Sequence, residues 1–157
     1  RVLPRVCARL VQMCVRDCFE TLAIALYLTD KTVRLIPAVP KTRAAAHQWA
    51  ALAASDLTPA MATQYFLTLR AKTDVSEATE WVLSEIDRFL TAIDGRLGEV
   101  PYLAGDTYSY ADVLTYPLMA TSVQRLEGGH TAYAHITRWA ETVGARDAVQ
   151  KGMAAAV

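Results

Sequence analysis

The segment 109–112 (Ser-Tyr-Ala-Asp) constrains the fold more than any other part of the sequence. The Ser109 side chain can accept a hydrogen bond from the backbone N–H of Asp112, and the Asp112 carboxylate can accept one from the N–H of Ser109. Together these bonds form a capping box, and Tyr108 and Val113 stand at the two positions of a hydrophobic staple around it. We therefore predict that a helix begins at Ser109, with these residues in a structural rather than a catalytic role.

The helix that follows this box is expected to reach about Leu126 and to be apolar on nearly all sides. Its charge-free stretch, Val113 to Gln124, has twelve residues, and a bilayer core requires roughly 20. A helix of this kind is typical of the centre of a domain, where neighbouring helices bury all of its faces. Pro117 is expected to bend it.

Helical periodicity also dominates the rest of the chain from about residue 20. An alanine-rich helix is predicted from Thr42 to about Leu69, kinked at Pro59 because proline lacks the N–H that would bond to Ser55. Shorter helices are predicted over 20–28, 131–143 and 147–155. A further helix from residue 74 or 76 has one apolar face, formed by Val82, Ile86, Phe89, Ile93 and Leu97. No segment alternates between apolar and polar residues, so the predicted fold class is all-α.

The composition excludes several classes of protein. The 157 residues are 53% hydrophobic and 20% charged, with a mean hydropathy of +0.16, which suits one domain with a substantial core and argues against a largely disordered chain. Sixteen basic residues balance sixteen acidic ones. We therefore expect no nucleic-acid partner and no membrane span.

The three cysteines lie together at the start of the chain, at Cys7, Cys14 and Cys18. They would share one face of a helix, either as half-buried thiols or as part of a metal site. The histidines are far away in the sequence, so we expect no metal. Because the number of cysteines is odd and no secretory segment is recognisable, we expect a reducing, cytoplasmic setting.

The first sixteen residues differ from the rest in charge, since they carry four arginines and no acid. Such a segment is compatible with an organellar transit peptide, or with a divergent or frame-shifted remnant of a longer protein. The sequence begins with Arg1 rather than Met, which is compatible with a fragment, a processed form or a trimmed chain.

Three segments resemble the soluble glutathione transferases. Residues 102–112 (Tyr-Leu-Ala-Gly-Asp-Thr-Tyr-Ser-Tyr-Ala-Asp) resemble the capping-box signature of that family's helical domain, residues 136–149 resemble its closing helices, and residues 48–57 are similar to the start of the domain in bacterial members. The resemblance covers about residues 19–157. It implies a helical bundle over 42–157, a linker over 32–41, and over 1–31 a remnant of a thioredoxin-like domain, of which 1–18 is divergent.

The resemblance also implies a glutathione site. Glu20 and Thr21 resemble the family's acidic-then-hydroxyl pair at the start of the last helix of the thioredoxin-like domain. There Thr21 would bond to the γ-glutamyl carboxylate and Glu20 would pair with the ammonium group, although the same two residues could simply cap a helix. Pro4 stands where the family has a cis-proline that helps to hold glutathione.

No residue matches the family's catalytic Tyr, Ser or Cys, so the catalytic residue stays unassigned. Tyr65, Tyr110 and Tyr116 are candidates for an apolar electrophile pocket, or pack in the core. Thr58 stands where some bacterial members carry a His near the active site. His47 is expected to be a packing or surface residue.

The resemblance implies conjugation of glutathione to an apolar electrophile, for which this chain alone is expected to be incomplete. Two alternatives remain open, a non-catalytic scaffold for protein association and a glutathione-dependent isomerase or dehalogenase. Family members usually form homodimers, and we expect self-association through apolar surface left uncovered on the helices at 42–69 and 75–97.

Overall fold

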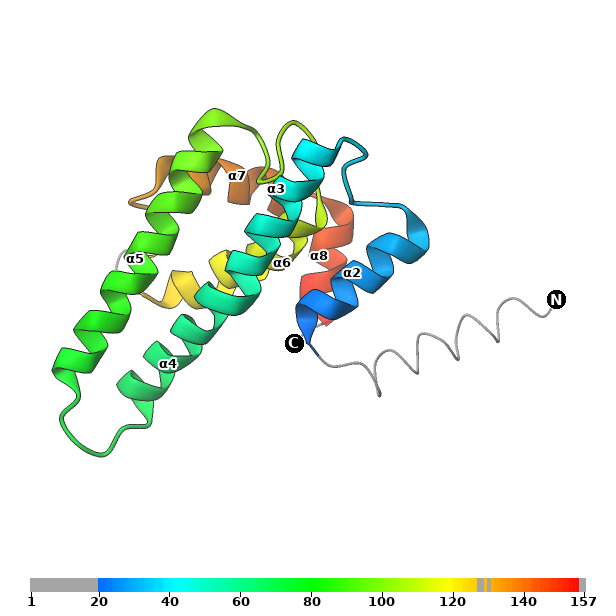
Figure 1. Ribbon diagram of the computed structural model, residues 1–157. Coiled ribbons are helices and arrows are strands. Elements are labelled where there is room, and N and C mark those ends of the chain that lie inside the picture. The colour runs from blue at the N-terminus through cyan, green and yellow to red at the C-terminus, as the bar shows by residue number, and fades with distance from the viewer. Residues whose placement is uncertain (1–19, 127–128, 130, 156–157) are drawn as a thin grey trace, which may run out of the picture.

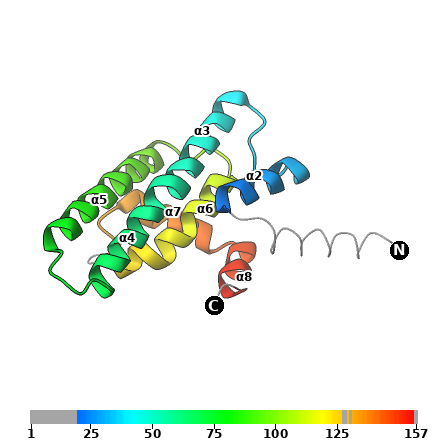
Figure 2. The same ribbon diagram turned by 60° about the horizontal axis from the view of Figure 1, so that its bottom comes forward.

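The computed structural model describes residues 20–126, 129 and 131–155. Its α-helices are α2 (Thr21–Thr32), α3 (Pro40–Ala51), α4 (Thr58–Leu69), α5 (Ser76–Glu99), α6 (Tyr110–Pro117), α7 (Ala134–Gly144) and α8 (Asp147–Ala155), and its other helical segments are η1 (Leu52–Leu57), η2 (Leu118–Ser122) and η3 (Val123–Arg125). The described residues form no strand, so the all-α fold class is confirmed. In Figure 1, the continuous run from α3 to α4 lies beside α5, and α6 lies behind that run. Figure 2 shows α2 and α8 at the side of the bundle away from α5, in agreement with Figure 1.

Helix α2 and its connection to α3 differ from the prediction in their bounds. The helix predicted over 20–28 continues to Thr32, and α3 begins at Pro40, so the connection is shorter than the linker predicted over 32–41. Leu35, in this connection, has a φ of 62°, in the left-handed region that residues other than glycine rarely adopt. Its carbonyl accepts the N–H of Tyr110 at 2.8 Å, which ties the connection to the start of α6.

At the position of the kink predicted at Pro59, the structure has a π-helical segment, η1, which ends two residues before the proline. The backbone N–H and the Oγ1 of Thr58 both donate to the carbonyl of Ala53, five residues earlier. A second π segment, η2, follows directly after Pro117. Because proline cannot donate to the helical ladder, the hydrogen bonds shift to a wider turn beside each one.

Helix α5 confirms its predicted buried face. All five predicted residues are buried, and Leu90 joins them. This face packs between α4 and α7, and the burial of such side chains is the main favourable term in folding. No helix in the described part of the chain is both long enough and apolar enough to cross a membrane.

Asp112 joins three parts of the fold through one fully buried carboxylate. Its Oδ2 accepts the backbone N–H of Ser109 at 2.9 Å and the Ser109 hydroxyl at 3.0 Å, so the two residues meet as a capping box requires. Its Oδ1 accepts the N–H of Leu103 at 3.0 Å and the indole N–H of Trp139 at 2.9 Å. The start of α6, the loop before it and helix α7 therefore share one acceptor.

A second carboxylate links α5 to the start of α7. Asp94 Oδ1 accepts the N–H groups of His135 and Ile136, both at 2.9 Å. These are first-turn donors with no partner inside their own helix, and a negative charge is favourable there. The contact fixes α7 against α5, beside the buried face.

Candidate functional site

A cavity of about 620 Å³ lies between α4 and the end of the α6–η3 run. Its lining residues are Thr58, Met61, Ala62, Gln64, Tyr65, Thr68, Leu69, Leu118, Ser122 and Arg125. One wall begins at Thr58, directly after η1, and the other contains Leu118 and Ser122, the first and last residues of η2. Both π segments therefore border this cavity, called here the α4–η2 cavity. Such segments are frequent at functional sites.

The α4–η2 cavity is lined by both apolar and polar side chains. Met61 is buried, and Leu118 is half-buried. Gln64 donates from Nε2 to Thr68 Oγ1 at 3.0 Å, so one of its amide hydrogens is already engaged. Among its lining residues Arg125 is the only charged one. The arrangement suits an apolar ligand with a few polar groups.

A second cavity, of about 630 Å³, lies between α6 and α8. Its lining residues are Leu35, Tyr108, Val113, Tyr116, Pro117, Thr121, Arg146, Ala148, Val149, Gly152 and Met153. The Arg146 guanidinium lies 3.9 Å from the centroid of the Tyr108 ring, so its charge is engaged by a cation–π contact. Tyr108 and Val113, the predicted staple pair, both line this cavity, and Val113 is 39% exposed.

The four residues predicted for one electrophile pocket do not share a cavity. Thr58 and Tyr65 line the α4–η2 cavity together, because seven residues on a helix are close to two full turns. Tyr116 lines the second cavity instead. Tyr110 is 2% exposed and belongs to the core, where its hydroxyl and His47 Nδ1 share a hydrogen bond of 2.5 Å.

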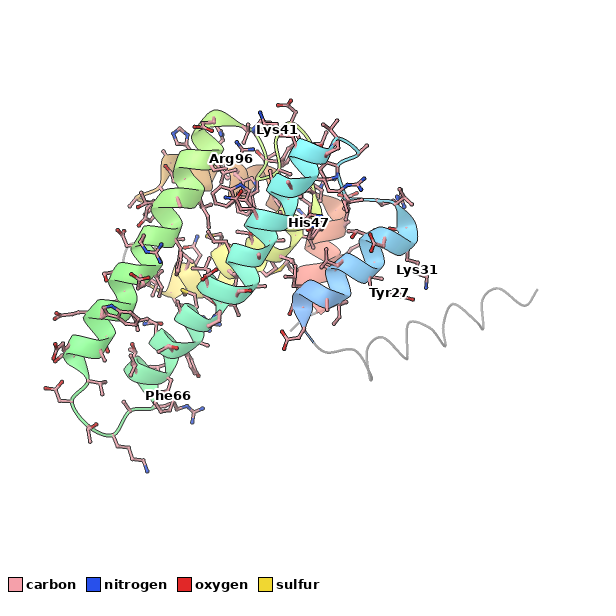
Figure 3. The ribbon with its side chains drawn as sticks, in the orientation of Figure 1. Tyr27, Lys31, Lys41, His47, Phe66 and Arg96 are labelled. Atoms are coloured by element: carbon pink, nitrogen blue, oxygen red, sulfur yellow. The ribbon has the colours of Figure 1, made fainter. Side chains whose placement is uncertain are left out.

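His47 lies on α3, facing α6, as an exposed residue in agreement with the expectation (Figure 3). Burial raises the pKa of the Tyr110 hydroxyl, and the nearby charge of Asp30 raises it further. The hydroxyl therefore stays protonated at neutral pH, and the pair serves to pack α3 against α6.

The predicted glutathione residues stand at the start of α2. Thr21 is its first residue, and Glu20 precedes it with a φ of 72°. Both are exposed, and neither side chain makes a hydrogen bond within the described part of the chain, including a capping bond. The two side chains are therefore free to meet a ligand, although neither lines either cavity.

Several predicted residues lie outside the described residues. Pro4 and the three cysteines fall in the first nineteen positions. Among the residues that the structure does describe, no three His, Cys, Asp or Glu side chains are grouped so that they could hold a metal ion.

Sequence reasoning found only Thr58 and Tyr65 among the residues that line the α4–η2 cavity, and the missed ones include Met61, Leu118, Ser122 and Arg125. Met61 could have been found, because it lies between Thr58 and Tyr65 at spacings of three and four. The other three come from the distant α6–η3 run. No local pattern relates them to α4, because their position depends on how the two runs pack.

Comparison with known proteins finds a matching family model and relatives of the same family. A family model for the C-terminal domain of glutathione S-transferases matches residues 57–147. The chain is 29% identical over 136 residues to the disulfide-bond oxidoreductase YfcG of Escherichia coli, covering 86% of this chain and 62% of that protein. It is 31% identical over 152 residues to the glutathione S-transferase-like protein tpcF of Aspergillus fumigatus, covering 87% of this chain and 68% of that protein.

The fold is similar to that of solved glutathione transferases. A crystal structure of one from Burkholderia graminis, with two glutathione molecules bound per subunit, superposes with a TM-score of 0.78 at 28% identity, covering 85% of this chain and 58% of that one. A Pseudomonas fluorescens family member with two glutathione molecules bound gives 0.77 at 25% identity, covering 85% of this chain and 62% of that one. The chain thus spans about three-fifths of the length of these relatives.

Proposed function

The chain belongs to the glutathione S-transferase family, whose C-terminal domain it contains, and we propose that it serves glutathione conjugation by holding the apolar electrophile in the α4–η2 cavity. The observation that carries the proposal is the pairing of Thr58 and Tyr65 on one wall of a largely apolar cavity of about 620 Å³. A volume of this size accommodates a small organic molecule.

The proposed reaction is a nucleophilic substitution. The thiolate sulfur of glutathione attacks the electrophilic carbon, a carbon–sulfur bond forms, and the leaving group departs with its electron pair as an anion. The cavity contributes by orienting the electrophile and excluding water from it, which reduces the entropic part of the barrier. Among the described residues we assign no group to the activation of the thiol.

Glu20 and Thr21 are proposed to hold the γ-glutamyl end of glutathione. The exposed start of α2 has no side-chain cap in the described part of the chain, and a helix start carries partial positive charge, which suits a carboxylate. The Thr21 hydroxyl would add a hydrogen bond, and the Glu20 carboxylate would pair with the ammonium group.

Titration calorimetry with glutathione tests this part of the proposal. We expect Thr21→Val to weaken glutathione binding about tenfold, the loss of one hydrogen bond to a charged group. Thr73→Val is the matched control, because Thr73 is an exposed threonine in the loop between α4 and α5. Absence of glutathione binding by the unmodified chain would leave the non-catalytic scaffold as the better reading.

Turnover of a chloronitrobenzene in the presence of glutathione tests the cavity. Tyr65→Ala is expected to raise the KM for the electrophile several-fold without changing the affinity for glutathione. Phe66→Ala is the control, since Phe66 is the next residue along α4 and does not line the cavity. Equal effects of the two substitutions would contradict the assignment.

The names of two relatives favour a second candidate function. Both are disulfide-bond oxidoreductases of Escherichia coli, at 29% and 34% identity. In the corresponding reaction, two glutathione thiols reduce a disulfide to two thiols and become glutathione disulfide. Assaying a small organic disulfide beside the chloronitrobenzene separates the two functions, because only the disulfide reaction oxidises glutathione.

A further inference from the structure

The charge of the α4–η2 cavity is set by Arg125 alone among its lining residues. None of the described residues that line the cavity is an Asp or Glu that could neutralise it. Within the described ranges, the Arg125 guanidinium forms no salt bridge and no hydrogen bond. In contrast, Arg96 donates to the Leu103 carbonyl at 3.1 Å, so its guanidinium is already partly used by the fold. Arg125 thus offers a planar set of N–H donors without a protein acceptor.

The residues around Arg125 make one part of the cavity apolar and leave the positive charge at the other. Leu118 and Ser122 come from the same α6–η3 run, with Leu118 two turns before Arg125. On the opposite wall, Gln64 Nε2 donates one of its hydrogens to Thr68. The Tyr65 hydroxyl has no hydrogen-bond partner among the described residues, so it can bond with a ligand. The cavity therefore has an apolar part beside Met61 and Leu118 and a cationic end at Arg125.

We propose that this cavity selects apolar electrophiles that carry a carboxylate, with Arg125 pairing with the carboxylate while Met61 and Leu118 contact the apolar body. A guanidinium matches a carboxylate with two parallel hydrogen bonds, which a neutral amide cannot reproduce. The role of the ligand as an electrophile rests on the proposed function, whereas the preference for an anion is a property of the cavity itself.

Binding without glutathione tests the preference directly. A chloronitrobenzoate and the matching neutral chloronitrobenzamide are titrated into the full chain, and the affinities are measured by NMR. We expect the benzoate to bind about fivefold more tightly, as for an exposed ion pair at the upper end of its range. The difference should shrink in roughly 1 M salt, where screening acts within about 3 Å.

Substitutions at Arg125 identify the group responsible. Arg125→Gln is expected to abolish the preference, and Arg125→Glu to invert it, while circular dichroism and the melting temperature stay unchanged. Arg34→Gln is the matched control, because Arg34 is an exposed arginine between α2 and α3 that lines neither cavity. The control should keep the full preference.

Two results would overturn the inference, equal affinity of the unmodified chain for benzoate and benzamide, or retention of the preference in Arg125→Gln. Because these titrations contain no glutathione, they are independent of the tests of conjugation. An anion preference without glutathione binding would reject the proposed function alone. If glutathione were conjugated to the benzoate and to the benzamide at equal rates, only the selection for an anion would be rejected.

Discussion

At the scale of single residues, we expect the stability of the fold to depend strongly on the Asp112 carboxylate. It is fully buried and accepts four hydrogen bonds, two at each oxygen. We expect Asp112→Asn to destabilise the fold by about 3 kcal/mol or more, because the new NH₂ group would face two donors and leave them without an acceptor. Urea unfolding measures the change.

Asp106→Asn provides the control for that substitution. Asp106 is exposed in the same loop, and its change should alter the free energy of unfolding by less than about 0.5 kcal/mol. If the two substitutions have similar effects, the shared carboxylate does not stabilise the fold as described.

Two helical glycines allow a second residue-scale test. A Cβ added at Gly144 would lie 2.6 Å from the Tyr116 hydroxyl oxygen, whereas one added at Gly95 would meet nothing within 4 Å. We expect Gly144→Ala to destabilise by about 1–3 kcal/mol through overpacking. Gly95→Ala should stabilise by about 0.5–1 kcal/mol, because alanine loses less entropy in a helix. Thermal unfolding measures both effects. A change of the melting temperature in the same direction for both variants would contradict this prediction.

At the scale of elements, α7 depends on a cap supplied by another helix. Asp94→Ala removes the acceptor for the first N–H groups of α7 and should cost about 1 kcal/mol. Asp94→Asn keeps Oδ1 as an acceptor and loses only the charge, so its cost should be about 0.3–1 kcal/mol. Urea midpoints of the two variants give the comparison, and equal losses would show that the charge, rather than the hydrogen bonds, matters.

The regular elements could be predicted from local patterns. The face of α5 was predictable because its apolar residues recur at helical spacing, and the start of α6 because Ser109 and Asp112 stand three residues apart. The positions of the prolines indicated where the other helices are interrupted. The form of each interruption did not follow from the sequence. The wider π-helical turns beside Pro59 and Pro117 accompany the missing proline N–H, but the sequence shows only that this donor is lost.

The candidate site was predictable only in part, because local patterns relate residues within one helix but not residues on different helices. Thr58 and Tyr65 share one helix, so their spacing already places them near one another. Tyr116 was grouped with them on chemistry alone, but its ring packs against Trp139 of α7 and it lines the other cavity. Arg125 reaches the site from a segment more than fifty positions away. Contacts of that range come from packing, which periodicity does not encode.

At the scale of the whole molecule, the end of the α4–α5 pair leaves large apolar side chains uncovered. Phe66 lies near this end of α4 (Figure 3), where it is 57% exposed, and Trp81 near the start of α5 is 65% exposed. Uncovered surface of this kind promotes association. We therefore predict that the chain self-associates at micromolar concentrations, which sedimentation velocity can measure.

Substitutions separate this surface from other exposed apolar residues. Phe66→Glu together with Trp81→Glu should shift the chain to a monomer. Val33→Glu should not, although Val33 is 80% exposed, because it lies in the connection between α2 and α3 rather than at this end. A monomer in the unmodified chain would contradict the prediction.

The acceptor shared at Asp112 also has a consequence for hydrogen exchange. The amide protons of Leu103 and Ser109 and the indole proton of Trp139 are all bound to this one carboxylate. None can exchange with solvent until the loop, α6 and α7 separate from each other, because Asp112 has no exposed surface. Three protons from distant parts of the sequence should therefore report a single opening event, with one common free energy.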